Sequence, residues 1–102
     1  MSDALVRRAV VVGADGIRVE TEAMPELADG HVRVALAFAG ICHSDIAAIA
    51  GGDVADGSRI GHEASGVVVA SRADGIAVGD RVVAYVGDAY ATHVDAPADR
   101  VV

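Results

Sequence analysis

The feature that most restricts the fold of this chain is a succession of short apolar runs, rich in β-branched residues and separated by turn signals. Asp-Gly or Gly-Asp pairs stand between several of these runs and are typical of turns. Short strand-like runs at regular spacing, with little helix, indicate a small, mainly β barrel or sandwich of about seven strands. The clearest candidates for strands are residues 4–12, 17–22, 31–38, 64–71, 81–86 and 89–94.

Residues 31–38 have the most regular strand pattern, because apolar residues occupy every second position. One expected face carries Val32, Val34, Leu36 and Phe38, and the other carries His31, Arg33, Ala35 and Ala37. The continuous run at residues 67–69 predicts a strand that is buried on both sides.

The local turns and the helix follow from glycine and aspartate. Residues 13–16 form a turn, so the strands on either side predict a β-hairpin. Residues 46–50 are expected to form a short helix, capped by Ser44 or Asp45 and ended by the glycines at 51 and 52. Aspartates in turn-like contexts are expected to bond the local backbone: Asp53, Asp56, Asp74, Asp88, Asp95 and Asp99.

The length of 102 residues is typical of one domain, and no boundary divides residues 1–102. No apolar run approaches the roughly 18 residues of a membrane span, and the first residues lack the pattern of a signal peptide. We therefore expect a cytoplasmic protein without a membrane partner. The single cysteine, Cys42, agrees with a reducing compartment, since it has no partner for an internal disulfide.

The net charge of −7 argues against nucleic acid as a partner, because such binding needs a basic surface to neutralise phosphates. All eight basic residues are arginine. Schiff-base chemistry on a lysine of this chain is therefore excluded.

Cys42, His62 and Glu63 supply one sulfur, one nitrogen and one carboxylate, which are the donors that zinc takes in tetrahedral sites. Residue types alone leave the alternatives open, since a lone cysteine is often a buried small hydrophobe. A nucleophilic pair of Cys42 and His43 is less favoured, because adjacent residues on a turn usually point apart.

Three ordered motifs carry a resemblance to a known family. Residues 40–45 read Gly-Ile-Cys-His-Ser-Asp, residues 61–68 read Gly-His-Glu-Ala-Ser-Gly-Val-Val, and residues 78–82 read Val-Gly-Asp-Arg-Val. Together they are very similar to the signature of the zinc-dependent medium-chain alcohol dehydrogenases. Residues 4–6 and 90–99 resemble further strands of the same family, so the likeness covers the whole chain. It implies a GroES-like β-barrel with one or two short helices.

The resemblance also implies roles for the residues in these motifs. Cys42 and His62 match zinc ligands, and Glu63 matches a carboxylate that can bind the metal in some states. Ser44 matches the hydroxyl that takes the proton of a substrate alcohol, and Asp45 an acid that orients the histidine ligand. His43 matches a contact to the cofactor pyrophosphate or a member of the proton relay. The implied reaction is hydride transfer between an alcohol or carbonyl substrate and NAD(P), assisted by Zn²⁺.

The chain also departs from the family pattern. A four-cysteine structural zinc lobe is absent, as in the quinone oxidoreductase and polyketide enoyl reductase branch, which often lacks zinc. No Gly-x-Gly-x-x-Gly unit occurs, so the Rossmann domain that binds NAD(P) is expected in a separate part of the parent protein.

Two hypotheses follow from the missing cofactor unit. One is the catalytic domain of an oxidoreductase, and the other is a stand-alone barrel that serves as a binding or assembly module. An apolar seam left without a Rossmann partner predicts a homo-oligomer.

Overall fold

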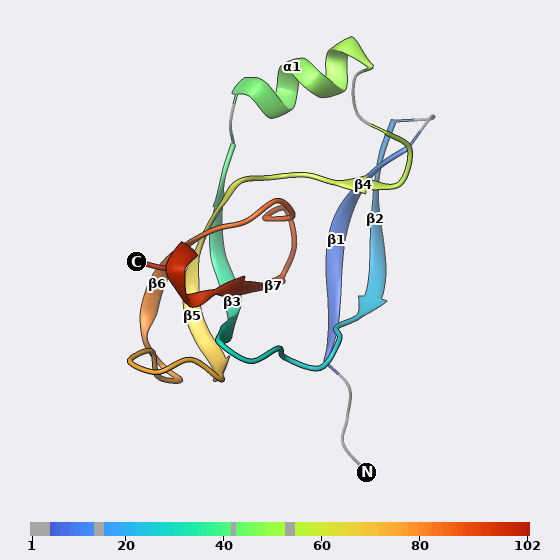
Figure 1. Cartoon of the computed structure of the whole chain (residues 1–102). Coiled ribbons are helices and arrows are strands. Elements are labelled where there is room, and N and C mark those ends of the chain that lie inside the picture. The colour runs from blue at the N-terminus through green and yellow to red at the C-terminus, as the bar shows by residue number, and fades with distance from the viewer. Residues whose placement is uncertain (1–4, 14–15, 42, 53–54) are drawn as a thin grey trace.

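The computed structural model describes residues 5–13, 16–41, 43–52 and 55–102. The elements in chain order (Figure 1) are β1 Val6–Gly13, β2 Gly16–Ala23, β3 His31–Gly40, α1 His43–Gly51, β4 Ser58–Arg59, β5 Glu63–Ser71, β6 Arg81–Tyr85, β7 His93–Pro97 and the 3₁₀ turn η1 Ala98–Arg100. This order confirms the prediction of a mainly β domain with one short helix.

The strands form two antiparallel sheets. The first has the order β2-β1-β4 and the second the order β6-β5-β3-β7. The segment before β7 joins them, because Val10 N donates to Tyr90 O at 2.8 Å and Thr92 N donates to Arg8 O at 2.8 Å. These bonds hold β1 against the second sheet.

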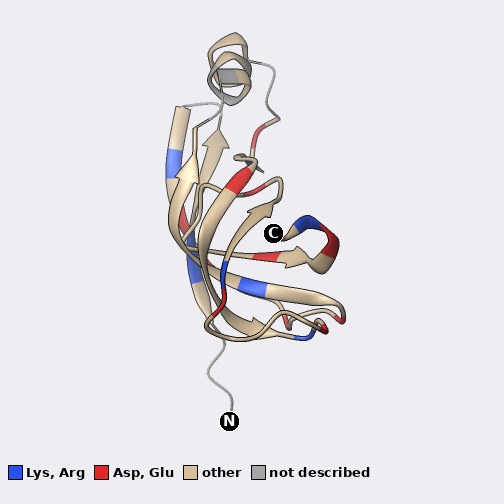
Figure 2. Cartoon of the chain, turned by 90° about the vertical axis from the view of Figure 1, so that its left-hand side faces the viewer, with Lys and Arg blue, Asp and Glu red and all other residues tan. Residues whose placement is uncertain are grey.

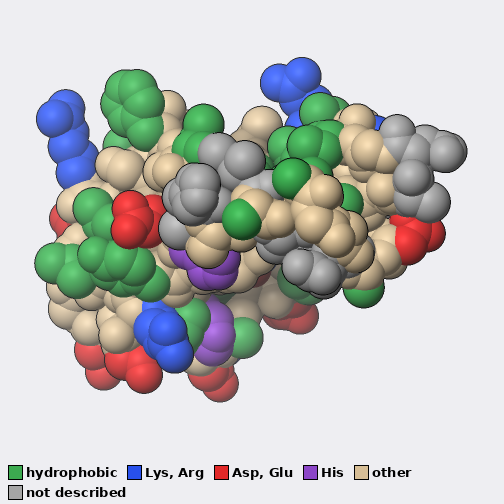
Figure 3. Space-filling model, turned by 90° about the horizontal axis from the view of Figure 1, so that it is seen from above, with side chains coloured by type: hydrophobic (Ala, Val, Ile, Leu, Met, Phe, Trp, Pro, Cys, Tyr) green, Lys and Arg blue, Asp and Glu red, His purple; other side chains and the backbone are tan. Residues whose placement is uncertain are grey.

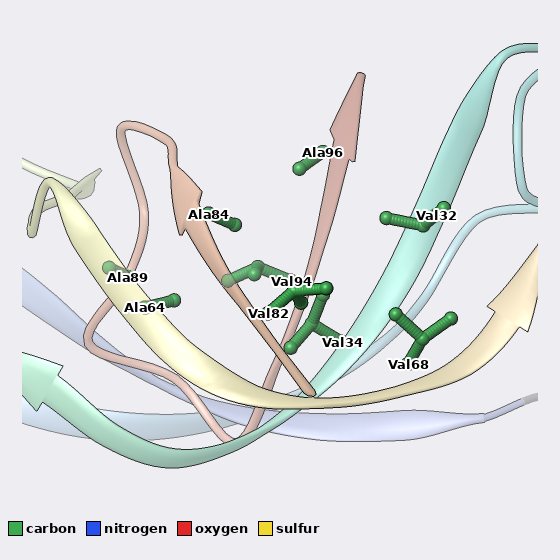
Figure 4. Close-up of a cluster of buried hydrophobic side chains, with 9 residues drawn as sticks. All are labelled: Val32, Val34, Ala64, Val68, Val82, Ala84, Ala89, Val94 and Ala96. Atoms are coloured by element: carbon green, nitrogen blue, oxygen red, sulfur yellow. The ribbon is translucent and has the colours of Figure 1, made fainter. Parts of the chain in front are cut away.

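The main core lies on the inner face of the second sheet (Figure 4). Its valines and alanines come from β3, β5, β6 and β7 and from the loop between the last two strands. Full burial of a valine contributes roughly 1.5 kcal/mol or more. The nine buried residues of this cluster are Val32, Val34, Ala64, Val68, Val82, Ala84, Ala89, Val94 and Ala96.

Several local predictions are confirmed. β1 and β2 pair antiparallel as a hairpin, from Val6 opposite Ala23 to Gly13 opposite Gly16. The helix is present, although it begins at His43, before both of the expected caps. It ends beside Gly52, whose φ of +72° favours glycine.

Two predictions about strand faces are wrong. Phe38 does not share the buried face of Val32, because the register shifts between Leu36 and Phe38. Such a bulge turns the following side chains to the other face, and Phe38 is 75% exposed. The run 67–69 is not buried throughout, because Val68 points into the core while Val67 and Val69 are exposed.

The last strand is also displaced from its predicted position at residues 89–94. β7 begins at His93, and Ala91 makes only an isolated bridge to Ala9. A loop over residues 86–92 joins β6 to β7. Ala89 lies in that loop but is buried in the core. The prediction assigned Ala89 to a strand because its apolar side chain fits the pattern of a buried strand residue.

Ion pairs link neighbouring strands within each sheet and join β1 to the loop before β7, which corrects the expected role of two aspartates. Arg7 on β1 donates to Glu22 on β2 at 2.9 Å and to Asp88 at 2.7 Å. Arg33 on β3 pairs with Asp95 on β7 at 2.7 Å. Asp88 and Asp95 thus pair with arginines distant in the sequence.

Candidate functional site

The register between β3 and β5 brings the two halves of the predicted site together. Gly40, the last residue of β3, lies opposite Glu63, the first residue of β5. A Cβ atom on Gly40 would lie 3.0 Å from Glu63 Oε2, so the glycine leaves room for the carboxylate. Cys42 follows Gly40 by two residues but lies outside the described residues.

The backbone next to His62 packs closely against the backbone of Tyr90. Gly61 has a φ of +108°, and a Cβ there would lie 2.8 Å from Tyr90 N. Tyr90 N donates to Ile60 O, and Val86 N donates to His62 O, both at 3.1 Å. Glycine is therefore required immediately before the histidine, and this requirement accounts for the first residue of the Gly-His-Glu motif.

Two pockets meet at His62. One of about 270 Å³ is lined by Gly40, Ile41, His62 and Glu63. The other, of about 700 Å³, is lined by His62, Tyr85, Val86, Gly87, Asp88, Asp95, Pro97 and Arg100. The molecule seen from the α1 end (Figure 3) shows histidine side chains at the surface among hydrophobic ones. An imidazole at the junction of two pockets is accessible to small molecules.

The predicted site residues are only partly described. His62 and Glu63 are exposed and line the smaller pocket, and Ser44 is exposed in the first turn of α1. The side chains of His43 and Asp45 lie outside the described part of the chain, as does Cys42. Among the described residues, no group of three His, Cys, Asp or Glu side chains could hold a metal ion.

A charged cluster that the sequence reasoning missed lines a pocket of about 320 Å³ at the side of the domain. Its centre is Glu22, which binds Arg7 and Arg59. Hydrogen bonding to Arg59, followed by that to Arg7, lowers the pKa of Glu22 despite its partial burial. The sequence predicts that Glu22 lies on a strand over residues 17–22, but it does not predict which residues bind its carboxylate. Its partners, Arg7 and Arg59, are known only from the pairing of the strands in the structure.

His93 is half-buried on β7. Burial lowers the pKa of its imidazole, and the nearby Arg33 and Arg7 lower that pKa further. His93 Nδ1 lies 3.1 Å from Thr92 Oγ1. The neutral imidazole is therefore favoured in the folded protein.

Within the described residues, no helix has the length and apolar character needed to cross a membrane.

The fold and the register of the motifs define a GroES-like β domain, and the sequence matches the alcohol dehydrogenase GroES-like domain over residues 28–101. The chain belongs to this domain family of the alcohol dehydrogenases. Sorbitol dehydrogenase of Bombyx mori is 38% identical over 81 residues, which cover 72% of this chain and 23% of that protein.

Solved structures show the same relationship. The human synaptic vesicle membrane protein VAT-1 homolog-like protein is 30% identical with a TM-score of 0.81, over 96% of this chain and 35% of that one. Mycobacterial Rv1454c complexed with NADPH is 27% identical with a TM-score of 0.76, over 93% of this chain and 31% of that one. The chain thus spans about a third or less of the length of these relatives.

Proposed function

We propose that this chain is the zinc-binding catalytic domain of an alcohol dehydrogenase-type oxidoreductase. The reaction is hydride transfer between a small alcohol or carbonyl compound and NAD(P), which a separate Rossmann domain of the parent protein holds. The observation that carries the proposal is the pairing of Gly40 with Glu63, because it sets His62 and Glu63 beside the segment that leads to Cys42. Family membership and the NADPH-bound relative support the same chemistry.

The donor set fits zinc. His62 supplies an imidazole nitrogen and Glu63 a carboxylate at one exposed pocket, and Cys42 supplies a thiolate from the neighbouring segment. Three protein donors leave a position for substrate, as in catalytic zinc sites. A free thiol such as that of Cys42 stays reduced in the cytosol, which supports a cytoplasmic location.

When bound, zinc polarises an alcohol or carbonyl oxygen and lowers the pKa of the alcohol. The side chains then have separate tasks. Ser44 accepts the hydroxyl proton of the substrate and passes it towards solvent, and His43 joins that relay or contacts the cofactor pyrophosphate. Asp45 orients the imidazole of the liganding histidine and so raises its basicity.

The test is the metal content of protein purified without chelator. We expect about one zinc per chain in the wild type and none in Cys42→Ala or His62→Ala. His31→Ala is the matched control, because His31 Nδ1 already contacts Asp29 O at 2.9 Å at the far end of β3. A metal-free wild type would refute the proposal and favour the binding or assembly module.

We also propose that the chain forms a homo-oligomer. The contact surface is a group of exposed apolar side chains that the pairing of the strands places on one face of the second sheet.

A further inference from the structure

The outer face of the second sheet carries an apolar stripe across β3, β5 and β6. In the register, Phe38 lies opposite Ser65 and Ser65 lies opposite Val83, so the three side chains share a face. Val67 and Tyr85 continue the stripe along β5 and β6. The exposed fractions are 75% for Phe38, 45% for Tyr85, 39% for Val67 and 37% for Val83. Contiguous exposed apolar side chains of this kind mark interaction surfaces.

The stripe has an acidic end and a basic end. On the neighbouring strands β5 and β6, Glu63 lies opposite Tyr85 at one end of the stripe, and Val67 lies opposite Arg81 at the other. The row formed by Ser65 and Val83 lies between these two rows. A rise of about 3.3 Å per residue separates the two rows by about 13 Å. In Figure 2, blue and red segments mark the basic and acidic residues along the ribbon of the domain.

Neither charge is satisfied within the described part of the chain. The side chains of Glu63 and Arg81 make no hydrogen bond or ion pair there, whereas Arg7, Arg33 and Arg59 are all paired. One acidic and one basic group, at opposite ends of an apolar stripe, form a self-complementary surface. A two-fold axis between two copies sets Glu63 of each against Arg81 of the other, as in an isologous interface.

We propose that a second copy of this chain covers the stripe, with its apolar side chains at the centre and two Glu63–Arg81 pairs at the ends. This proposal specifies the self-association proposed above, and it requires no bound zinc, although it shares Glu63 with the proposed zinc site. A stable interface buries roughly 800 Å² per partner, compared with a total accessible surface of 6150 Å². We therefore expect a reversible dimer whose population rises with protein concentration.

The test is the mass of the 102-residue chain by sedimentation equilibrium over a concentration series. We expect the mass to rise to twice 10.2 kDa. Phe38→Ser and Glu63→Arg should each weaken dimerisation at least tenfold, while Ile17→Ser should not. Ile17 is the matched control because it is 58% exposed but lies on β2, in the other sheet.

Charge exchange gives the sharpest measurement. Glu63→Arg and Arg81→Glu should each be monomeric alone, should form a heterodimer when mixed, and should dimerise again when combined in one chain. A monomeric wild type at every concentration would overturn the proposal, as would a dimer that keeps its mass in Phe38→Ser and Glu63→Arg. A monomer that still binds zinc would leave the proposed function intact, and a metal-free dimer would refute only the zinc site.

Discussion

Replacing Glu22 by glutamine removes the charge at the centre of the ion cluster while keeping the size of the side chain. Glu22 lies 2.8 Å from Arg7 and 2.5 Å from Arg59, and its side chain is 25% exposed. Hydrogen bonds to charged groups contribute about 1.5–3 kcal/mol when buried, and partial exposure reduces that value. We expect Glu22→Gln to lower the free energy of unfolding by about 1 kcal/mol at pH 7.

The pH dependence separates this effect from a general loss of packing. The folded-state pKa of Glu22 lies below its ordinary value of 4.5, chiefly through Arg59. Its contribution is therefore fully present above pH 4.5 and is lost as the pH falls through the folded-state pKa. In urea titrations at several pH values, the difference between wild type and Glu22→Gln should narrow below pH 4.5. Glu26→Gln is the control, because Glu26 is exposed and unpaired among the described residues. A difference that stays constant down to pH 3, or is absent at pH 7, would refute the reasoning.

Two further predictions concern packing and titration. Gly66→Ala should destabilise the domain by about 3 kcal/mol in urea unfolding, because its Cβ would collide with the carbonyl oxygen of Ala35 in the neighbouring strand. Gly87→Ala, where nothing lies within 4 Å of the added atom, should change stability little, and equal losses would contradict the argument. His93 has a lowered folded-state pKa, so the unfolded state binds more protons below pH 6.5 and stability should fall as the pH drops from 7. His93→Gln should flatten that part of the stability curve, and an unchanged slope would count against burial as the cause.

Much of the secondary structure could be predicted from the sequence because the signals are local. The pairing of β1 with β2 and the strand at residues 31–38 depend on neighbours in the chain, and both elements are present as predicted. The exposure of Phe38 was not predictable in this way, because the bulge arises from the pairing of β3 with β5. A side chain's face is set by the partner strand as well as by its own alternation.

The candidate site shows the same division. The donor types and the likeness to a family are visible in the sequence, whereas the approach of β3 and β5 depends on the fold. Gly40 and Gly61 illustrate the difference, because each looks like an ordinary turn glycine until its neighbours are placed. Gly40 then proves to adjoin the Glu63 carboxylate, and Gly61 the backbone of Tyr90.

The position of Glu63 links the proposed chemistry to the proposed assembly. It lines the pocket with His62, and it also faces outward in the row of Tyr85 on the apolar stripe. A carboxylate near a cation is stabilised in its charged form, whether the cation is a metal or an arginine. Arg81 of a second copy would therefore compete with zinc for this carboxylate. Added zinc should then lower the average mass measured by sedimentation equilibrium, and an unchanged mass would contradict this competition.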